Sequence, residues 1–319
     1  MRFNQASVTR RRPSASVPAV KRFSSCTNLP LVRVLAGART RRSKTSSRRF
    51  VGLLVGCGLA VAWFATPTAT ATPKCFGHTA TIVGTNGPDR IHGTGQPDVI
   101  VAGRGHDIVQ SFGGDDLVCG GQGADMLILN GGADKGNGQR GDDGIRGRGG
   151  DDLLKGGRDG DYFGGLVGGS GDDRLLAGEG RDYLSDRLGA NVYRGGLGND
   201  LMQDFGRSDD LFFGGKGGSD HVFWAGFQPV SADLTTGHAT GFGEDTLVGV
   251  EELEGGAGSD TLIGDDLDNV LVGNFGDDHL EGRGWNDILD GGDSSDFLDG
   301  GAGTQDRCAN GETVLNCEL

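Results

Sequence analysis

Aspartate recurs every nine residues through most of this 319-residue chain. The spacing starts at Asp89 and resumes at Asp173 after three residues, 165–167, that we interpret as an insertion. A second run begins at Asp260 and ends at Asp296. A fixed short period of this length indicates one small structural unit stacked many times, rather than a mixed globular core.

A second regularity separates a folded repeat from a disordered Gly/Asp tract. The residue two places after each of these positions is aliphatic, aromatic or Met in every repeat but one, where Gly136 leaves a hole. Only 35% of the chain is hydrophobic, so chance does not explain this placement. The expected core positions are Ile91, Ile100, Val109, Val118, Leu127, Ile145, Leu154, Phe163, Leu175, Leu184, Tyr193, Met202, Phe212, Val222, Leu262, Leu271, Leu280, Leu289 and Leu298.

The repeat reads G-G-x-G-x-D-x-U-x with U apolar, as in GGQGADMLI at residues 120–128 and GRGGDDLLK at 147–155. This pattern resembles the RTX, or hemolysin-type, calcium-binding repeat family, over residues 84–223 and 255–304. The resemblance implies a right-handed parallel β-roll in which two nonapeptides complete one coil. It also implies Ca²⁺ between successive turns, bound by stacked aspartates and by carbonyls of the glycine-rich turns.

Simple stereochemistry agrees with that architecture. The x-U-x triplet can form a very short strand with U inward, and the six glycine-rich residues can form the turn. We therefore predict an all-β solenoid in two blocks behind a disordered N-terminal leader. The expected parts are a leader (1–71), an N-terminal cap (72–83), a first block (84–223), an irregular, partly β insertion (224–254), a second block (255–304) and a C-terminal disulfide cap (305–319).

Stacked aspartates predict the cation sites. Two carboxylates one strand spacing apart, about 4.8 Å, repel by about 3–4 kcal/mol at an effective dielectric near 20, and Ca²⁺ reverses the sign. Asn191 and Asn269 stand at ligand places without a charge. The expected metal ligands are Asp89, Asp98, Asp107, Asp116, Asp125, Asp134, Asp143, Asp152, Asp161, Asp173, Asp182, Asp200, Asp210, Asp220, Asp260, Asp278, Asp287 and Asp296.

The first 71 residues resemble a targeting segment. They carry thirteen Lys or Arg and no acidic residue, and an apolar stretch at 50–64 is followed by small residues at 69–71. We expect cleavage before Thr72 and a secreted or cell-surface mature chain without membrane insertion; an uncleaved anchor and lipidation at Cys57 are the alternatives. Four cysteines then remain, and of three possible pairings we expect Cys75–Cys119 and Cys308–Cys317, the pairs nearest in sequence.

Composition limits the function. Residues 72–319 carry 44 acidic and 17 basic side chains, which disfavours nucleic acid as a partner. The chain contains neither H-E-x-x-H nor G-x-S-x-G, and no segment is left over for a catalytic domain. We therefore expect no enzyme, but a calcium-binding structural or surface protein. The alternatives are an adhesin that binds polysaccharide or another cell through the aromatic residues Phe223, Trp224 and Phe227, and a cryptic hydrolase.

Overall fold

The computed structural model describes residues 72–318, and all statements below concern that part of the chain. It contains strands and turns, and no helix in residues 72–318 is long and apolar enough to cross a membrane. The predicted leader, its cleavage site and the alternatives at Cys57 lie outside the described residues.

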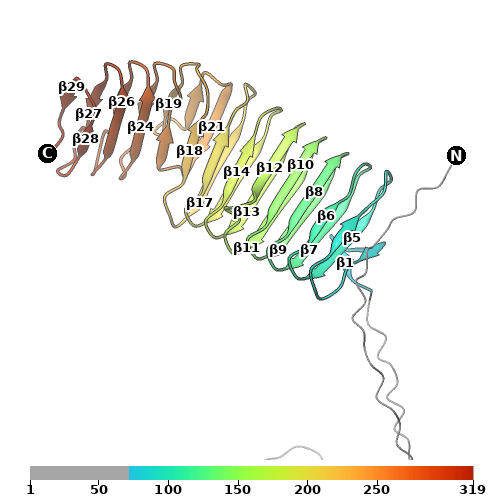
Figure 1. Ribbon diagram of the computed structural model, residues 1–319. Coiled ribbons are helices and arrows are strands. Elements are labelled where there is room, and N and C mark those ends of the chain that lie inside the picture. The colour runs from blue at the N-terminus through green and yellow to red at the C-terminus, as the bar shows by residue number, and fades with distance from the viewer. Residues whose placement is uncertain (1–71, 319) are drawn as a thin grey trace, which may run out of the picture. The chain divides into compact units, whose positions relative to one another are not determined.

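Two long sheets of mostly parallel strands run side by side through the array, and the chain alternates between them (Figure 1). Each half coil adds one strand to one sheet. In spatial order, the twelve-stranded sheet contains β4 (Arg90–His92), β6 (Ile108–Gln110), β8 (Met126–Gly131), β10 (Gly144–Gly149), β12 (Gly165–Ser170), β14 (Tyr183–Asp186), β16 (Leu201–Asp204), β18 (His221–Trp224), β22 (Glu252–Glu254), β24 (Val270–Phe275), β26 (Ile288–Asp293) and β28 (Arg307–Ala309). The fifteen-stranded sheet contains β3 (Ile82–Val83), β5 (Val99–Arg104), β7 (Leu117–Gln122), β9 (Lys135–Arg140), β11 (Leu153–Arg158), β13 (Arg174–Glu179), β15 (Val192–Leu197), β17 (Leu211–Lys216), β21 (Glu244–Val248), β20 (His238–Thr240), β19 (Ser231–Asp233), β23 (Thr261–Ile263), β25 (His279–Glu281), β27 (Phe297–Asp299) and β29 (Thr313–Leu315).

Most strands are longer than the three residues expected from the motif. In β7 the strand continues from Leu117 through two glycines to Gln122, and its neighbours β5 and β9 are equally long, with Ala102-Gly103 and Gly138-Gln139 at the same places. Most glycines at the second motif position have positive φ, for example +119° at Gly103 and +125° at Gly121. A Cβ at Gly121 would also collide with the carbonyl oxygen of Gly103, one coil earlier, so glycine lets the stacked pairing continue into the turn.

The apolar positions form the inner ladders of the solenoid. From Ile91 to Leu298, the predicted core residues are fully buried, with one exception. Phe163 is 92% exposed, and Leu166 takes its place between Ile145 and Leu184. The inserted residues are therefore 162–164 and not 165–167. With Leu166 in the core, β12 runs directly into the glycine turn of the next repeat. If Phe163 were the core residue instead, residues 165–167 would lie between the strand and that turn.

The hole expected at Gly136 is filled. A Cβ on Gly136 would lie 2.9 Å from Cγ2 of Ile145 and 3.2 Å from Cδ1 of Leu129. Leu129 occupies the first motif position, where glycine is usual, and it is fully buried. The large side chain of Leu129, at the first motif position, therefore fills the space that the missing side chain at Gly136 would leave in the core.

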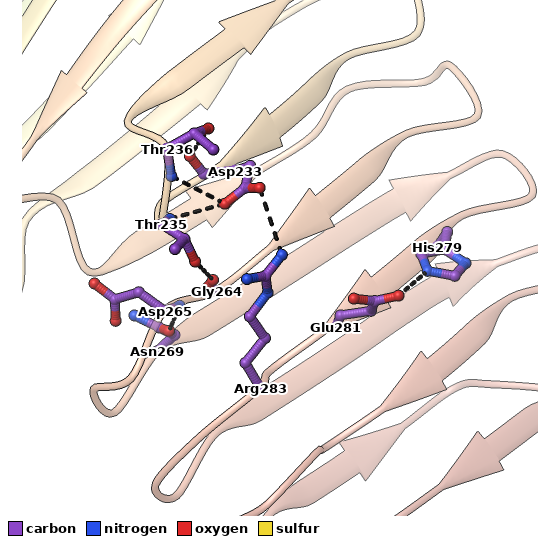
Figure 2. Close-up of polar contacts among 9 residues, drawn as sticks. All are labelled: Asp233, Thr235, Thr236, Gly264, Asp265, Asn269, His279, Glu281 and Arg283. Atoms are coloured by element: carbon purple, nitrogen blue, oxygen red, sulfur yellow. Dashed lines mark hydrogen bonds and ion pairs between the residues drawn. The ribbon is translucent and has the colours of Figure 1, made fainter.

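The irregular insertion at 224–254 is part of both sheets. On one side β18 pairs directly with β22, and on the other β19, β20 and β21 form antiparallel pairs that join β17 to β23. Trp224 is fully buried rather than part of a surface patch. Figure 2 shows how Asp233 fixes the hairpin, by accepting a hydrogen bond from the Thr235 amide at 2.8 Å and pairing with Arg283 at 3.5 Å.

Disulfides lie at both ends of the described chain, and they are the expected pairs. Cys75, in a small hairpin formed by β1 (Lys74–Cys75) and β2 (His78–Thr79), is bonded to Cys119 of β7. Cys308 is bonded to Cys317. The C-terminal segment also forms one more coil, because β28 and β29 add parallel strands to the two sheets.

Candidate metal sites between the coils

The aspartates at the sixth motif position form two ranks, one before each sheet. In both ranks the backbone N–H of one aspartate donates to Oδ1 of the aspartate one coil later, as from Asp98 to Asp116 and from Asp116 to Asp134, at 2.7–2.8 Å. Asn191 keeps this place, since its Oδ1 accepts from the Asp173 amide at 2.9 Å. From Asp107 onward, one side-chain oxygen of nearly every repeat is therefore used to hold the coils in register.

The second carboxylate oxygen has no partner in most repeats, although it is buried. A buried acceptor without a donor is costly, and a carboxylate is costlier than a neutral group. Within residues 72–318, the unpartnered Oδ2 atoms belong to Asp107, Asp116, Asp125, Asp134, Asp143, Asp152, Asp161, Asp173, Asp182, Asp186, Asp200, Asp204, Asp210, Asp278, Asp287, Asp296 and Asp306.

A second oxygen faces these Oδ2 atoms from the next coil. A Cβ on Gly120, at the first motif position, would lie 2.5 Å from Oδ2 of Asp125 and 3.1 Å from the carbonyl oxygen of Gly138. The same crowding recurs at Gly147 and Gly273. Two acceptors that approach one another without a donor need a cation, and oxygen-only ligation suits Ca²⁺. The residues present therefore fit this ion.

Burial has a consequence for the protonation of these groups. Loss of solvent, opposed by the ladder hydrogen bonds and reinforced by neighbouring carboxylates, raises the pKa of Asp161, Asp173 and Asp210 to about 8. It raises the pKa of Asp134 and Asp143 to about 7. Without a cation, the folded array holds protons that an unfolded chain would release near neutral pH.

Four turns are different, and we call them closed turns: those ending at Asp89, Asp98, Asp260 and Asn269. In each, the residue at the second motif position donates its amide N–H to the side-chain oxygen four residues later. The donors are Thr85, Thr94, Gly256 and Asp265, with N–O distances of 2.6–2.9 Å. Figure 2 shows this contact between Asp265 and Asn269. None of these second positions has positive φ. We call the remaining turns, with an unpartnered Oδ2, open turns.

The structure places further acidic side chains in the ranks that the periodic alignment missed. Asp245 and Asp306 accept ladder hydrogen bonds from the amides of Asp210 and Asp287. Both precede an apolar residue by two places, Leu247 and Cys308, and this was the available signal. Glutamates continue or end the ranks: Glu251, Glu312 and Glu318 accept from Asp220, Asp296 and Asp306. Asp186 and Asp204 are buried at the first motif position, outside the aspartate period.

Side chains alone do not complete a metal shell here. Among the described residues, no group of three His, Cys, Asp or Glu side chains is placed to hold a metal ion. Backbone carbonyls must therefore supply the remaining ligands, as the glycine turns allow.

These features define a class of protein: a parallel β-solenoid with carboxylates and carbonyls facing one another between successive coils. A family model described as the RTX calcium-binding nonapeptide repeat matches the chain four times, at residues 92–127, 167–202, 254–284 and 272–304. These matches support the RTX-type repeat family for the repeats of this chain, and such repeats imply calcium binding. A search of curated proteins found no match.

Proposed function

We propose that this protein is a secreted structural protein that folds by binding Ca²⁺ in its open turns. The observation that supports this most directly is the series of buried Oδ2 atoms without a partner, several of which, as beside Gly120, Gly147 and Gly273, lie opposite a carbonyl oxygen of the next coil. A bound Ca²⁺ supplies the positive charge that both oxygens lack. The role is non-catalytic, because in this proposal every buried carboxylate of the ranks serves ion binding or coil register.

The proposal divides the expected ligands into two groups. The open-turn aspartates of both ranks, together with Asp220 beside Gly214, hold the ions. In the closed turns, Oδ2 of Asp89, Asp98 and Asp260 already accepts a hydrogen bond within its own turn, and Asp260 also accepts at Oδ1, so these three serve as structural residues. We extend the ligand set to Asp306, which completes the same arrangement in the last coil.

Folding and export are coupled in this proposal. The inner ladders hold little more than one apolar side chain per repeat, and ordering so much glycine costs considerable conformational entropy. The net charge of −27 on residues 72–319 opposes compaction until cations bind. Such a chain stays unfolded where calcium is scarce and folds in a calcium-rich compartment outside the cell.

Calcium titration of the purified chain, followed by far-UV circular dichroism and isothermal calorimetry, tests the proposal. We expect strand formation and heat of binding together, with more than one ion per chain, and reversal by a chelator. Magnesium at matched ionic strength should not replace calcium, because it requires tighter octahedral geometry. Full strand content in excess chelator, with no calorimetric binding, would refute the proposal.

A second candidate function has one supporting observation. Phe227 is 84% exposed and Phe275 58% exposed, and they line a shallow groove with Phe223, beside the polar groups of Glu254 and Asn274. Exposed rings next to hydrogen-bonding groups suit the faces of sugars. A glycan array comparing the wild type with Phe227→Ala tests binding of polysaccharide at this groove; unchanged glycan binding by the variant would rule the groove out.

A further inference from the structure

One repeat carries its acid at the wrong motif position. In residues 186–194, Asp186 stands at the first position, where glycine is usual, and Asn191 stands at the sixth, where aspartate is usual. Asp186 is the last residue of β14 and is 1% exposed. The charge that Asn191 lacks is therefore still present in this coil, but at another place.

The Asp186 side chain reaches the gap between two coils. Its Oδ1 accepts hydrogen bonds from the amides of Gly169, at 2.7 Å, and Arg187, at 2.6 Å. Its Oδ2 has no partner. A Cβ on Gly168 would collide both with this Oδ2 and with Oδ2 of Asp173, so the two unpartnered oxygens face the same small space.

This arrangement differs from the regular turns. Beside Gly120, one carboxylate oxygen faces a backbone carbonyl of the next coil. Beside Gly168, the oxygen from the next coil belongs to a second carboxylate. The gap between Asp173 and Asp186 therefore carries twice the negative charge of a regular turn, at the same depth in the molecule.

The described residues around Asp173 and Asp186 add further polar groups and supply no positive charge. One coil later, Asp204 again occupies the first motif position, with a buried, unpartnered Oδ2. The hydroxyl of Tyr193 is buried without a partner in the field of Asp186 and Asp204. This row of acidic first-position residues ends at Trp224, which follows Asp204 in the sheet. Its indole N–H donates to Asp245 at 3.1 Å, so Oδ2 of Asp245 has a partner.

We propose that Asp173 and Asp186 form a two-carboxylate calcium site, the tightest in the array, with Asp204 continuing the acidic wall one coil later. The proposal rests on calcium binding by the open turns as the proposed function. Calcium affinity in oxygen-only sites depends on the number of charged ligands and on rigidity, and both favour this gap. It should therefore fill at lower calcium than turns with a single carboxylate.

Terbium luminescence offers a local readout, because Tb³⁺ replaces Ca²⁺ and is sensitised by nearby aromatic rings. The full chain has three Tyr and three Trp; Tyr193 lies buried in the field of Asp186, and the buried Trp224 lies two strands further along, beyond Asp204. In the wild type, we expect the first equivalents of Tb³⁺ to give sensitised emission. Tyr193→Phe should reduce that early emission without changing the calcium stoichiometry.

Three variants of the full chain decide the question. Asp186→Asn keeps the acceptor oxygen for Gly169 and should lower the affinity of the tightest calcium class at least tenfold. Asp172→Asn, an exposed acid in the same coil, should leave it unchanged. Asp186→Gly combined with Asn191→Asp recreates the regular motif and should restore one ion of ordinary affinity.

The outcomes separate this inference from the proposed function. If wild type and Asp186→Asn both fold on calcium with identical tight-site affinity, the two-carboxylate site is wrong and the open-turn proposal stands. If neither binds calcium, the proposed function itself fails. Loss of the tight class in Asp172→Asn as well would show an effect of net charge only, and would also overturn the site.

Discussion

Neighbouring aspartates in one turn have different tasks, as Asp115 and Asp116 show. Asp116 is fully buried with an unpartnered Oδ2. Asp115, at the fifth motif position, accepts a hydrogen bond from the Ala133 amide at 3.0 Å and is otherwise exposed to solvent. Only one of the two carboxylates is thus placed to hold an ion, although the sequence shows two identical residues.

Asp116→Asn and Asp115→Asn form a matched pair, since asparagine keeps an acceptor oxygen in both. We expect Asp116→Asn to reduce the free energy of unfolding in calcium by about 1–3 kcal/mol, through loss of a charged ligand. Asp115→Asn should change it by less than about 0.5 kcal/mol. Chemical denaturation at saturating calcium measures both, and equal losses would contradict the assigned register.

Leu129 is the other residue whose task depends on its surroundings. It fills the space beside Gly136, so we expect Leu129→Ala to cost about 2–5 kcal/mol by opening a cavity. Leu129→Met, which conserves volume, should cost less than about 1.5 kcal/mol. Denaturation midpoints of the two variants test this, and a Leu129→Ala variant as stable as the wild type would mean that the gap is not filled by this side chain.

At the scale of the strand, the insertion after Asp161 gives a direct test. Deleting residues 162–164 should leave the solenoid intact, because Gly165 would then follow Asp161 with Leu166 already in the core. Deleting 165–167 instead would force Phe163 into a space between Ile145 and Leu184, and overpacking should cost about 1–3 kcal/mol more. Thermal unfolding in calcium compares the two deletions; a larger loss for 162–164 would reverse our assignment of the insertion.

The sequence predicted the elements of the roll better than their exact limits. Period and apolar spacing were sufficient for the parallel solenoid and for its inner ladders. They were not sufficient at residues 162–167, where Phe163 and Leu166 both satisfy the pattern and only continuity with the glycine turn decides. The repeat pattern also did not predict the length of the strands, because that length depends on whether a glycine with positive φ still pairs with the next coil.

The candidate sites show the same limit. Alignment on one aspartate per nonapeptide finds the ranks, but a position in a motif does not reveal where Oδ2 points. The closed turn at Asp98 and the open turn at Asp116 both end in aspartate, and they differ in one hydrogen bond from the Thr94 amide. Asp186 was missed because it stands outside the period, and only the stacked structure brings it to Asp173.

For the whole molecule, protons and calcium compete for the same oxygens. Burial raises the pKa of Asp161, Asp173 and Asp210 to about 8, above the ordinary value of an unfolded aspartate. In the calcium-free chain these groups therefore stabilise the fold fully below about pH 4, and this stability is lost as the pH rises through about 8.

We therefore expect the calcium-free chain to gain strand content as the pH is lowered from 8 towards 4. In the folded chain, the calcium concentration at half-saturation should rise as the pH is lowered from 8 to 6, because protons compete with the ion for the same oxygens. The calcium concentration at half-folding should not rise, because protonation stabilises the calcium-free fold. Circular dichroism with chelator across this pH range, and calcium titrations at pH 6 and pH 8, measure the two effects. If the calcium concentration at half-saturation of the folded chain is the same at pH 6 and pH 8, these carboxylates do not bind the ion.

The closed turns give the array a direction. Two of them, at Thr85–Asp89 and Thr94–Asp98, make up its first coil, and the other two stand where the second block begins. In these turns the side-chain oxygen that is unpartnered elsewhere accepts a hydrogen bond, so in the proposed function it needs no ion, whereas the open turns do. The molecule thus resembles a crystal with two built-in seeds: in the proposed calcium-driven folding, coils are added from the first coil and from the start of the second block.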